Sequence, residues 1–199
     1  MNKQQQRALE TRNRILKAAE DTFAQTGYDA TGVAAICREA GVSKGAFYHH
    51  FESKQDIFLQ LLQNWLGGMD AQLAALGTGT GDVSDRLQSM SGLIWAVLQL
   101  AGKKLPLYLE FWNQAARDPL VWEKTIEPYR RYRTFFTGMI DQGISEGSLK
   151  EVSSESASSV VVALAVGLLI QGLLDPDGVD WEQVSQEGMQ ILLNGLSKD

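Results

Sequence analysis

Apolar residues recur along this chain at every third or fourth position, which is the spacing of one face of an α-helix. The strict alternation that marks a half-buried β-strand is nearly absent, and the chain has only four prolines. We therefore predict an all-α fold of about nine helices. The expected segments, caps included, are residues 6–26, 31–40, 43–51, 54–76, 83–103, 105–117, 120–146, 154–174 and 181–196.

Turn-forming residues separate these segments. The expected helix ends and turns are Gly27 as a C-cap, Thr31 and Ser43 as N-caps, the flexible stretch GTGTGD at 77–82 and the turn DPDG at 175–178. Pro128 has no N–H to donate, so we expect it to kink or restart the helix around it.

Charge is divided unevenly along the chain. Residues 1–54 hold eight Lys and Arg against six Asp and Glu, a net charge of +2, whereas residues 55–199 carry −8 of the total of −6. A weakly basic head can approach phosphates while an acidic body avoids non-specific contact. The excess of +2 is small, so other signals must identify the partner.

Cysteine use and hydropathy bear on location. The single cysteine, Cys37, cannot form an internal disulfide, which suits a reducing compartment. The first residues, MNKQQQRALETRNR, have no apolar stretch typical of a secretory signal. The longest strictly apolar run, 160–170, is shorter than the ~20 residues that cross a bilayer. We expect a cytoplasmic protein without membrane contact.

Residues 31–51 have the pattern of a helix-turn-helix, with two short helices joined at Gly41-Val42-Ser43. The inward positions would be Val33, Ile36, Val42, Phe47 and Phe51. The outward positions would then be Lys44, Gly45, Ala46, Tyr48 and His49. Small and polar residues outside, with apolar residues inside, are what a DNA recognition helix needs.

The segment TGVAAICREAGVSKGAFYHHFESK (31–54) resembles the DNA-binding signature of the tetracycline-repressor (TetR) family. The matching positions are Thr31, Ile36, Ala40, Gly41, Val42, Ser43, Gly45, Phe47, Tyr48, His50, Phe51 and Lys54. Cys37 stands where the family usually has alanine, and Gln55-Asp56 stands where an acidic residue usually follows at once. The likeness covers about the first quarter of the chain. Elsewhere it extends to length, helix order and the segment 107–119.

The resemblance implies a role for each matching position. Thr31, Tyr48 and Lys54 would contact phosphates, which fixes register without reading sequence. The major groove would be faced by Lys44, Gly45, Ala46 and His49, and Ser43 belongs to the same DNA-binding set. His50 would point inward. The resemblance also implies a DNA-binding domain at 1–53 and an effector-binding and dimerisation domain at 54–199.

Aromatic residues are frequent in the middle helices, and their spacing alone favours a core over a ligand site. The resemblance implies instead that an effector pocket lies between these helices. The expected lining is Trp95, Tyr108, Phe111, Trp112 and Met139, with Glu110 or Asn113 as a polar anchor. Such apolar walls would suit a small apolar or aromatic effector.

The run VVVALAVGLLIQGLL (160–174) is apolar on all sides, so it must be covered on all sides. Two copies of the last two helices could pack as a four-helix interface. The expected contacts are Val161, Leu164, Leu168, Trp181, Val184, Gly188, Ile191 and Gly195. In the alternative, the rest of one chain covers both helices.

A dimer would also explain how a small reading head gains specificity. Two heads about 34–36 Å apart would read successive major grooves and therefore a palindrome. An effector that tilts the helix 54–76 would move the heads off this spacing and release the DNA. We therefore expect a homodimeric, ligand-responsive regulator that acts as a repressor.

The sequence also bears on other functions. Adjacent helical residues point apart, so His49 and His50 do not form a metal pair, and no metal or cofactor is expected. Cys37 lies on a buried face, which disfavours redox sensing. The sequence has no nucleophile elbow, metal-ligand cluster or phosphate loop, so we do not expect an enzyme. An activator, or a body that binds another protein through exposed aromatic residues, remains open.

Overall fold

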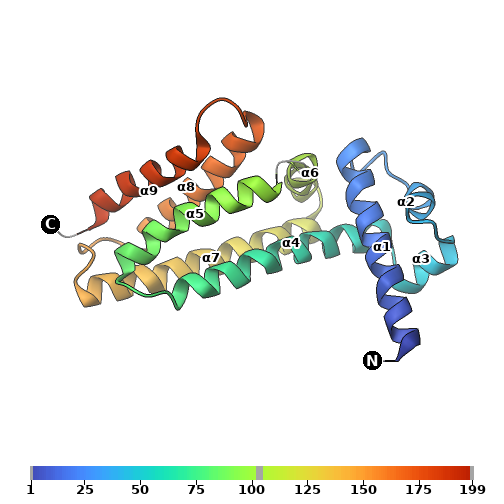
Figure 1. Ribbon diagram of the computed structural model, residues 1–199, viewed down its shortest axis with the longest axis horizontal. Helices are drawn as coiled ribbons and strands as arrows, with labels where there is room; N and C mark the ends of the chain where they lie inside the picture. Colours follow the sequence, from blue (N-terminus) through green and yellow to red (C-terminus); the bar gives the residue numbers. More distant parts are fainter. Residues whose placement is uncertain (1, 102–104, 198–199) are drawn as a thin grey trace. The chain divides into compact units, whose positions relative to one another are not determined.

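The computed structural model describes residues 2–101 and 105–197, and the fold in these ranges is all-α, as predicted (Figure 1). The helices are α1 (Lys3–Thr26), α2 (Val33–Ala40), α3 (Lys44–His50), α4 (Lys54–Gly77), α5 (Val83–Ala101), α6 (Leu105–Ala115), α7 (Pro119–Glu146), α8 (Ser154–Leu174) and α9 (Trp181–Leu196). An isolated antiparallel bridge joins Leu149 to Ser197.

The first helix begins earlier than the apolar pattern predicted. Asn2 caps α1 by accepting a hydrogen bond from the N–H of Gln4, and the Gln5 side chain accepts one from the N–H of Asn2. This reciprocal capping box needs no apolar residue, so the polar start of the chain is helical from Lys3. Gly27, with φ of 80°, ends the helix as expected.

The second helix begins later than predicted, because Gly32 and not Thr31 is its N-cap. The Thr31 hydroxyl lies 2.7 Å from the carbonyl oxygen of Gly27, to which it donates, and Thr31 is only 2% exposed. The cap predicted at Ser43 is confirmed, since its hydroxyl accepts from the N–H of Ala46 at 3.1 Å.

Pro128 does not restart the helix in which it lies. Helix α7 runs without interruption from Pro119 to Glu146. Proline removes one hydrogen bond, whereas Tyr132, Phe136 and Ile140 are buried along the same helix. Packing therefore holds the helix together across the proline.

The chain forms two compact units, and each has its own core. The first consists of 1–67 with 104–125, and the second of 68–103 with 126–199. The first unit therefore includes α6, which packs against α1. The boundary predicted at 53/54 lies inside this unit, and the functional division at that point stays a prediction because compactness does not locate function.

The core of the first unit is largely aromatic. Phe23 meets Phe58 edge to face with ring centroids 5.6 Å apart, and Phe58 lies 4.5 Å from Phe111 of α6. Ile15, Ile36 and Phe47 are also completely buried, although they come from three different helices. Burial of these side chains gives α2 and α3 a fixed position on α1.

In the second unit α5 packs against both α8 and α9 (Figure 1). Its core includes Val83, Leu87, Ile140, Leu149 and Met189. Helix α8 buries Val161, Leu168, Leu169 and Leu173, all on one side, within the chain. The alternative in which one chain covers α8 on all sides is therefore wrong for the described residues, because Val160 and Leu174 are 51% and 62% exposed.

Candidate functional site

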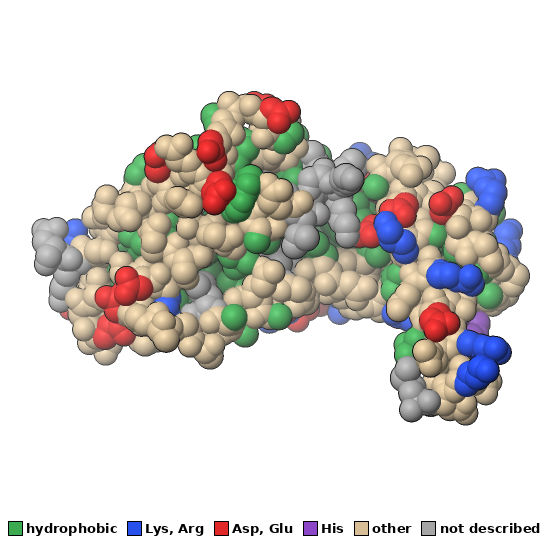
Figure 2. Space-filling view, in the orientation of Figure 1, with side chains coloured by type: hydrophobic (Ala, Val, Ile, Leu, Met, Phe, Trp, Pro, Cys, Tyr) green, Lys and Arg blue, Asp and Glu red, His purple; other side chains and the backbone are tan. Residues whose placement is uncertain are grey.

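Helix α3 has a buried face and an exposed face. Phe47 is completely buried, and Phe51, at the C-cap, is almost so. Lys44, Gly45, Tyr48 and His49 are exposed, and Ala46 is partly covered. On the face shown in Figure 2, Lys and Arg side chains gather over α1–α3. The arrangement predicted for a recognition helix is therefore present.

The turn before α3 depends on Gly41, whose φ of 63° and ψ of 40° lie in the left-handed region. A residue with a Cβ is strained there, whereas glycine is not. The N–H of Val42 donates to the carbonyl of Cys37 at 3.0 Å, which closes the turn. Cys37 is buried beside it and packs as a small apolar residue. Together these features direct the N-terminus of α3 outward.

Thr31 and Lys54 use their polar atoms inside the protein. The buried hydroxyl of Thr31 is not presented to a phosphate, which corrects the role expected for it. The Lys54 ammonium donates to the carbonyl of Tyr28 at 2.8 Å and lies 4.1 Å from the centre of its ring. Lys54 thus holds the loop between α1 and α2, and a phosphate contact by it stays a prediction. Tyr48, by contrast, is well exposed.

The two histidines divide as predicted in exposure. His49 is exposed and His50 is partly buried, with ring centroids 5.0 Å apart. Burial lowers the pKa of His50, and the positive charges of His49 and Arg12 lower it further. Arg12 also stacks over Phe51 and donates to the side chain of Gln60. Within residues 2–101 and 105–197 no cluster of His, Cys, Asp and Glu suits a metal ion.

A polar network, which we call the α6 brace, joins the head to α6 and to Asp118 in the turn that follows α6. The amide of Gln114 donates to Asp29 at 3.3 Å and to Glu110 at 2.8 Å. Gln55, in the first turn of α4, donates to Asp118 at 2.7 Å. The contacts of Gln114 with Asp29 and of Gln55 with Asp118 were not predicted, because each joins residues more than 60 positions apart in the chain. The only local signal is Asp118 before Pro119, a pattern typical of a helix start.

The α6 brace also affects Tyr28. Burial raises the pKa of the Tyr28 hydroxyl, and the negative charges of Asp118, Asp29 and Glu110 raise it further. Its ring packs against Phe58, with centroids 4.4 Å apart. Tyr28 thus links the polar network to the aromatic core of the first unit.

The five residues expected to line an effector pocket fall into both units. Phe111 is buried against Phe58, and Trp112 is 39% exposed, both in the first unit. Trp95 and Met139 belong to the second unit, where Met139 is buried. Tyr108 is part of α6, but its side chain lies outside the described residues. The effector set therefore stays a prediction.

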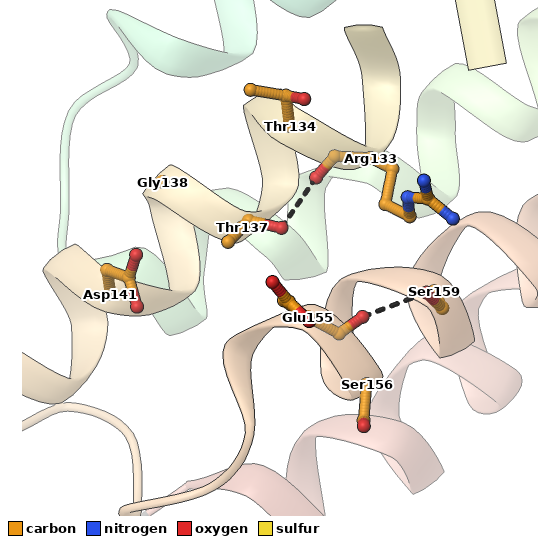
Figure 3. A pocket seen from close by; sticks show the side chains of 8 residues that line it. All are labelled: Arg133, Thr134, Thr137, Gly138, Asp141, Glu155, Ser156 and Ser159. Carbon is orange, nitrogen blue, oxygen red and sulfur yellow. Dashed lines mark hydrogen bonds between the residues drawn. The ribbon is translucent and has the colours of Figure 1, made fainter. Parts of the chain in front are cut away.

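Two of the hollows among the described residues lie in the second unit. One, of about 890 Å³, lies between α7 and α8 (Figure 3). Its lining residues are Arg133, Thr134, Thr137, Gly138, Asp141, Glu155, Ser156 and Ser159. The other, of about 390 Å³, lies at the end of α4 and the start of α5. Neither contains any of the five expected effector residues.

The residues expected at a dimer interface differ in exposure. Val161 and Leu168 are buried within their own chain, so they are not available to a second copy, which corrects that expectation. Ile191 is 73% exposed and Gly195 is exposed. The remaining members, Leu164, Trp181, Val184 and Gly188, are partly covered.

Helix α8 also has the length and apolar composition of a membrane span, contrary to the expectation from the shorter run 160–170. The run 160–170 includes only strictly apolar residues, whereas α8 extends beyond it on both sides and also contains serines and a glutamine. Such a helix is equally typical of a protein core. Here one side of α8 packs against α5 and α9 of its own chain, so its length and composition are weak evidence for a membrane span.

Two family models match the chain. Residues 15–61 match the model described as "Bacterial regulatory proteins, tetR family". Residues 84–193 match the model described as "BetI-type transcriptional repressor, C-terminal". Together they cover more than half of the chain.

Single proteins of known name or structure are also similar. The transcriptional repressor KstR2 of Mycobacterium tuberculosis is 23% identical over 188 residues, which is 94% of each chain. A protein from Saccharomonospora viridis, solved in complex with choline, is 25% identical with a TM-score of 0.80 and coverage of 96% and 99%. FadR of Bacillus subtilis, solved with stearoyl-CoA, has a TM-score of 0.76 at 20% identity and coverage of 92% and 97%, which shows likeness of fold.

Proposed function

Because the chain belongs to the TetR family of bacterial regulatory proteins, we propose that it is a homodimeric repressor of transcription in the cytoplasm. It binds a palindromic operator and leaves it when a small effector binds the body. The observation that carries this proposal is α3, which buries Phe47 and exposes Lys44, Gly45 and His49. Members of this family are regulators and not enzymes.

In the proposed complex α3 enters the major groove. Lys44 and His49 offer donors to base edges, and Gly45 and Ala46 are small enough to allow the backbone close to them. Ser43 holds the first turn of α3 by its cap, and Tyr48 contacts a phosphate. Thr31 supports this surface from inside through its bond to Gly27.

The proposed dimer forms through the uncovered side of α8 and α9. Val160, Leu174 and Ile191 lie there, each more than half exposed. Burying one such side chain fully contributes about 1.5–3 kcal/mol, so leaving all three in water on a lone chain is unfavourable. Two-fold symmetry doubles this set and places two heads on one operator.

The proposed effector is a small molecule with an apolar or aromatic part, bound near Trp95, Tyr108, Phe111, Trp112 or Met139. The ligands of the two structures named above, choline and stearoyl-CoA, differ widely, so the fold alone does not identify the effector. A movement of α6 would reach the head through Gln114 and Asp29 of the α6 brace. A ~100-fold preference for the released state corresponds to about 2.7 kcal/mol of coupling.

The test is fluorescence anisotropy of the protein with DNA from upstream of its own gene, beside a scrambled duplex, at several salt concentrations. A duplex obtained by in vitro selection from random sequence serves as a second target. We expect tight binding to a specific duplex that weakens steeply with salt. Equal and weak binding to the selected and scrambled duplexes would overturn the proposal.

A second candidate function is supported by the exposure of aromatic residues on α6 and α7. Trp112 and Trp122 are both exposed, together with Leu109 and Leu120. These side chains could receive another protein in place of a small effector. Native mass spectrometry of the purified protein separates the two, because a co-purified small molecule that lowers DNA affinity supports the first candidate.

A further inference from the structure

Arg86, in the first turns of α5, is a buried cation. It is 7% exposed, and its Nη1 donates to the carbonyl of Gly77 at 2.9 Å. Its Nε–H is buried and has no acceptor. Among the described residues, Arg86 forms no ion pair, although its charge helps to lower the pKa of the exposed Glu146 after the hydrogen bonds that Glu146 accepts from Val83 and Ser148.

Such a group needs a physical explanation. Removing a guanidinium from water costs more than one hydrogen bond to a neutral carbonyl returns. A buried donor without an acceptor adds to that cost, and in native proteins a bound water or ion is one explanation for such a group. An anion beside the guanidinium of Arg86 would offset the cost of burying its charge.

The surroundings of Arg86 provide room for such an anion. Arg86 lines the hollow of about 390 Å³ together with the polar side chains of Gln72, Thr80 and Ser89. Ala75 and Leu93 add apolar surface to the same hollow. Polar groups gathered at one cation beside apolar wall are typical of a site for an amphipathic acid.

The charges near the hollow restrict the anion. Asp85 also lines it and is exposed, and Glu146 lies within the electrostatic influence of Arg86. Two nearby carboxylates repel a doubly charged phosphate more strongly than a singly charged group. Arginine pairs a carboxylate with two parallel hydrogen bonds.

We propose that this hollow binds a small monocarboxylic acid, with its carboxylate on Arg86 and its apolar tail toward Ala75 and Leu93. The proposal does not rest on DNA binding, and it places the ligand wholly within the second unit. None of the residues expected to line an effector pocket takes part in it.

The experiment compares hexanoate with 1-hexanol and inorganic phosphate as stabilisers of the full chain against thermal unfolding, at constant ionic strength set with chloride. We expect saturable stabilisation by hexanoate, with an about tenfold change in the unfolding equilibrium constant at ten times its Kd. Hexanol and phosphate should give little change. Equal stabilisation by hexanoate and hexanol would overturn the proposal, because the carboxylate would then contribute nothing.

Two matched variants locate the effect. Arg86→Gln should abolish stabilisation by hexanoate, and Arg133→Gln, in the other hollow, should keep it. Retained stabilisation in Arg86→Gln would place the ligand elsewhere. If Arg86→Gln does not fold, amide NMR of the unaltered chain replaces it. Saturable shifts should then concentrate at residues 77–93, and their absence there would overturn the proposal.

Discussion

The outer faces of α3 and of the α8–α9 pair differ in what they expose. Helix α3 leaves Lys44, Gly45 and His49 to solvent, which are polar or small. The α8–α9 pair leaves Leu174 and Ile191, which are large and apolar. Both regions bury an apolar inner face, so the outer face alone indicates the partner. A polar, donor-rich face suits DNA, whereas an apolar face suits another protein surface.

The first prediction makes the apolar face of α9 polar. In Ile191→Asp a charge replaces a side chain that is 73% exposed, so the single chain should stay folded. Two such charges buried in a symmetric interface should weaken dimerisation by about 100-fold or more, which is about 2.7 kcal/mol. Sedimentation velocity should show a monomer, and anisotropy should show loss of tight DNA binding.

A matched control adds the same charge one residue earlier. Gln190 lies beside Glu187 on the polar side of α9 and is exposed, so Gln190→Asp should leave the dimer intact. Gly188 is a poorer probe, because it faces Leu164 and Leu168 of the same chain, so a large side chain there would also disturb packing within the chain. A dimer that persists in Ile191→Asp would remove the α9 face from the interface.

The second prediction concerns the exposed face of α3. His49→Ala should alter preference at one or two base pairs, each by about 1–3 kcal/mol, because His49 is exposed on the proposed reading face. Tyr48→Phe should instead weaken binding to all sequences alike, as loss of a phosphate contact does. A panel of single base-pair substitutions measures both. Uniform weakening by His49→Ala would count against its assignment to base edges.

The two regions also differ in how far the sequence predicts them. The turn and α3 depend on particular residue types, namely Gly41 in the left-handed region and Ser43 as a cap. Such residues have few alternative uses, so the head could be predicted closely. Helix α8 is apolar on every side, so its sequence did not distinguish Val161, which faces the core, from Val160, which does not. Which side of α8 is buried depends on its packing against α5 and α9.

Long-range polar contacts were likewise beyond prediction. Lys54 lies at a position where a phosphate contact was expected, yet it donates to Tyr28, which is 26 residues away in the chain. Gln55 and Asp118 meet only because α4 and α6 fold onto the same head. A single sequence carries no pattern for such pairs, since each partner alone is an ordinary surface residue.

Lys54 therefore offers the third prediction. Lys54→Met should lower the free energy of unfolding by about 1 kcal/mol, because the loop carbonyl of Tyr28 loses a charged donor that is partly covered. Chemical unfolding measures this, and Lys17→Met, which removes an exposed charge, is the control. If Lys54 contacts a phosphate, Lys54→Met would instead reduce the salt slope of DNA binding by about 1 and leave the free energy of unfolding unchanged. That outcome would restore the role expected from the sequence.

The smallest effect concerns the pH response of the head. Burial and the charges of His49 and Arg12 lower the pKa of His50 below its ordinary value of about 6.5. The folded head then binds its proton less readily than the unfolded chain, so this contribution is complete above about pH 6.5 and is lost as the pH falls through the folded value. Stability should therefore drop more in the unaltered chain than in His50→Gln between about pH 7.5 and about pH 5.5.

Thermal unfolding at both pH values measures the difference, with the exposed neighbour substituted in His49→Gln as the comparison. Equal losses in the unaltered chain and His50→Gln would mean that His50 titrates alike in the folded and unfolded states, and that the inner face of α3 is as open to water as its outer face.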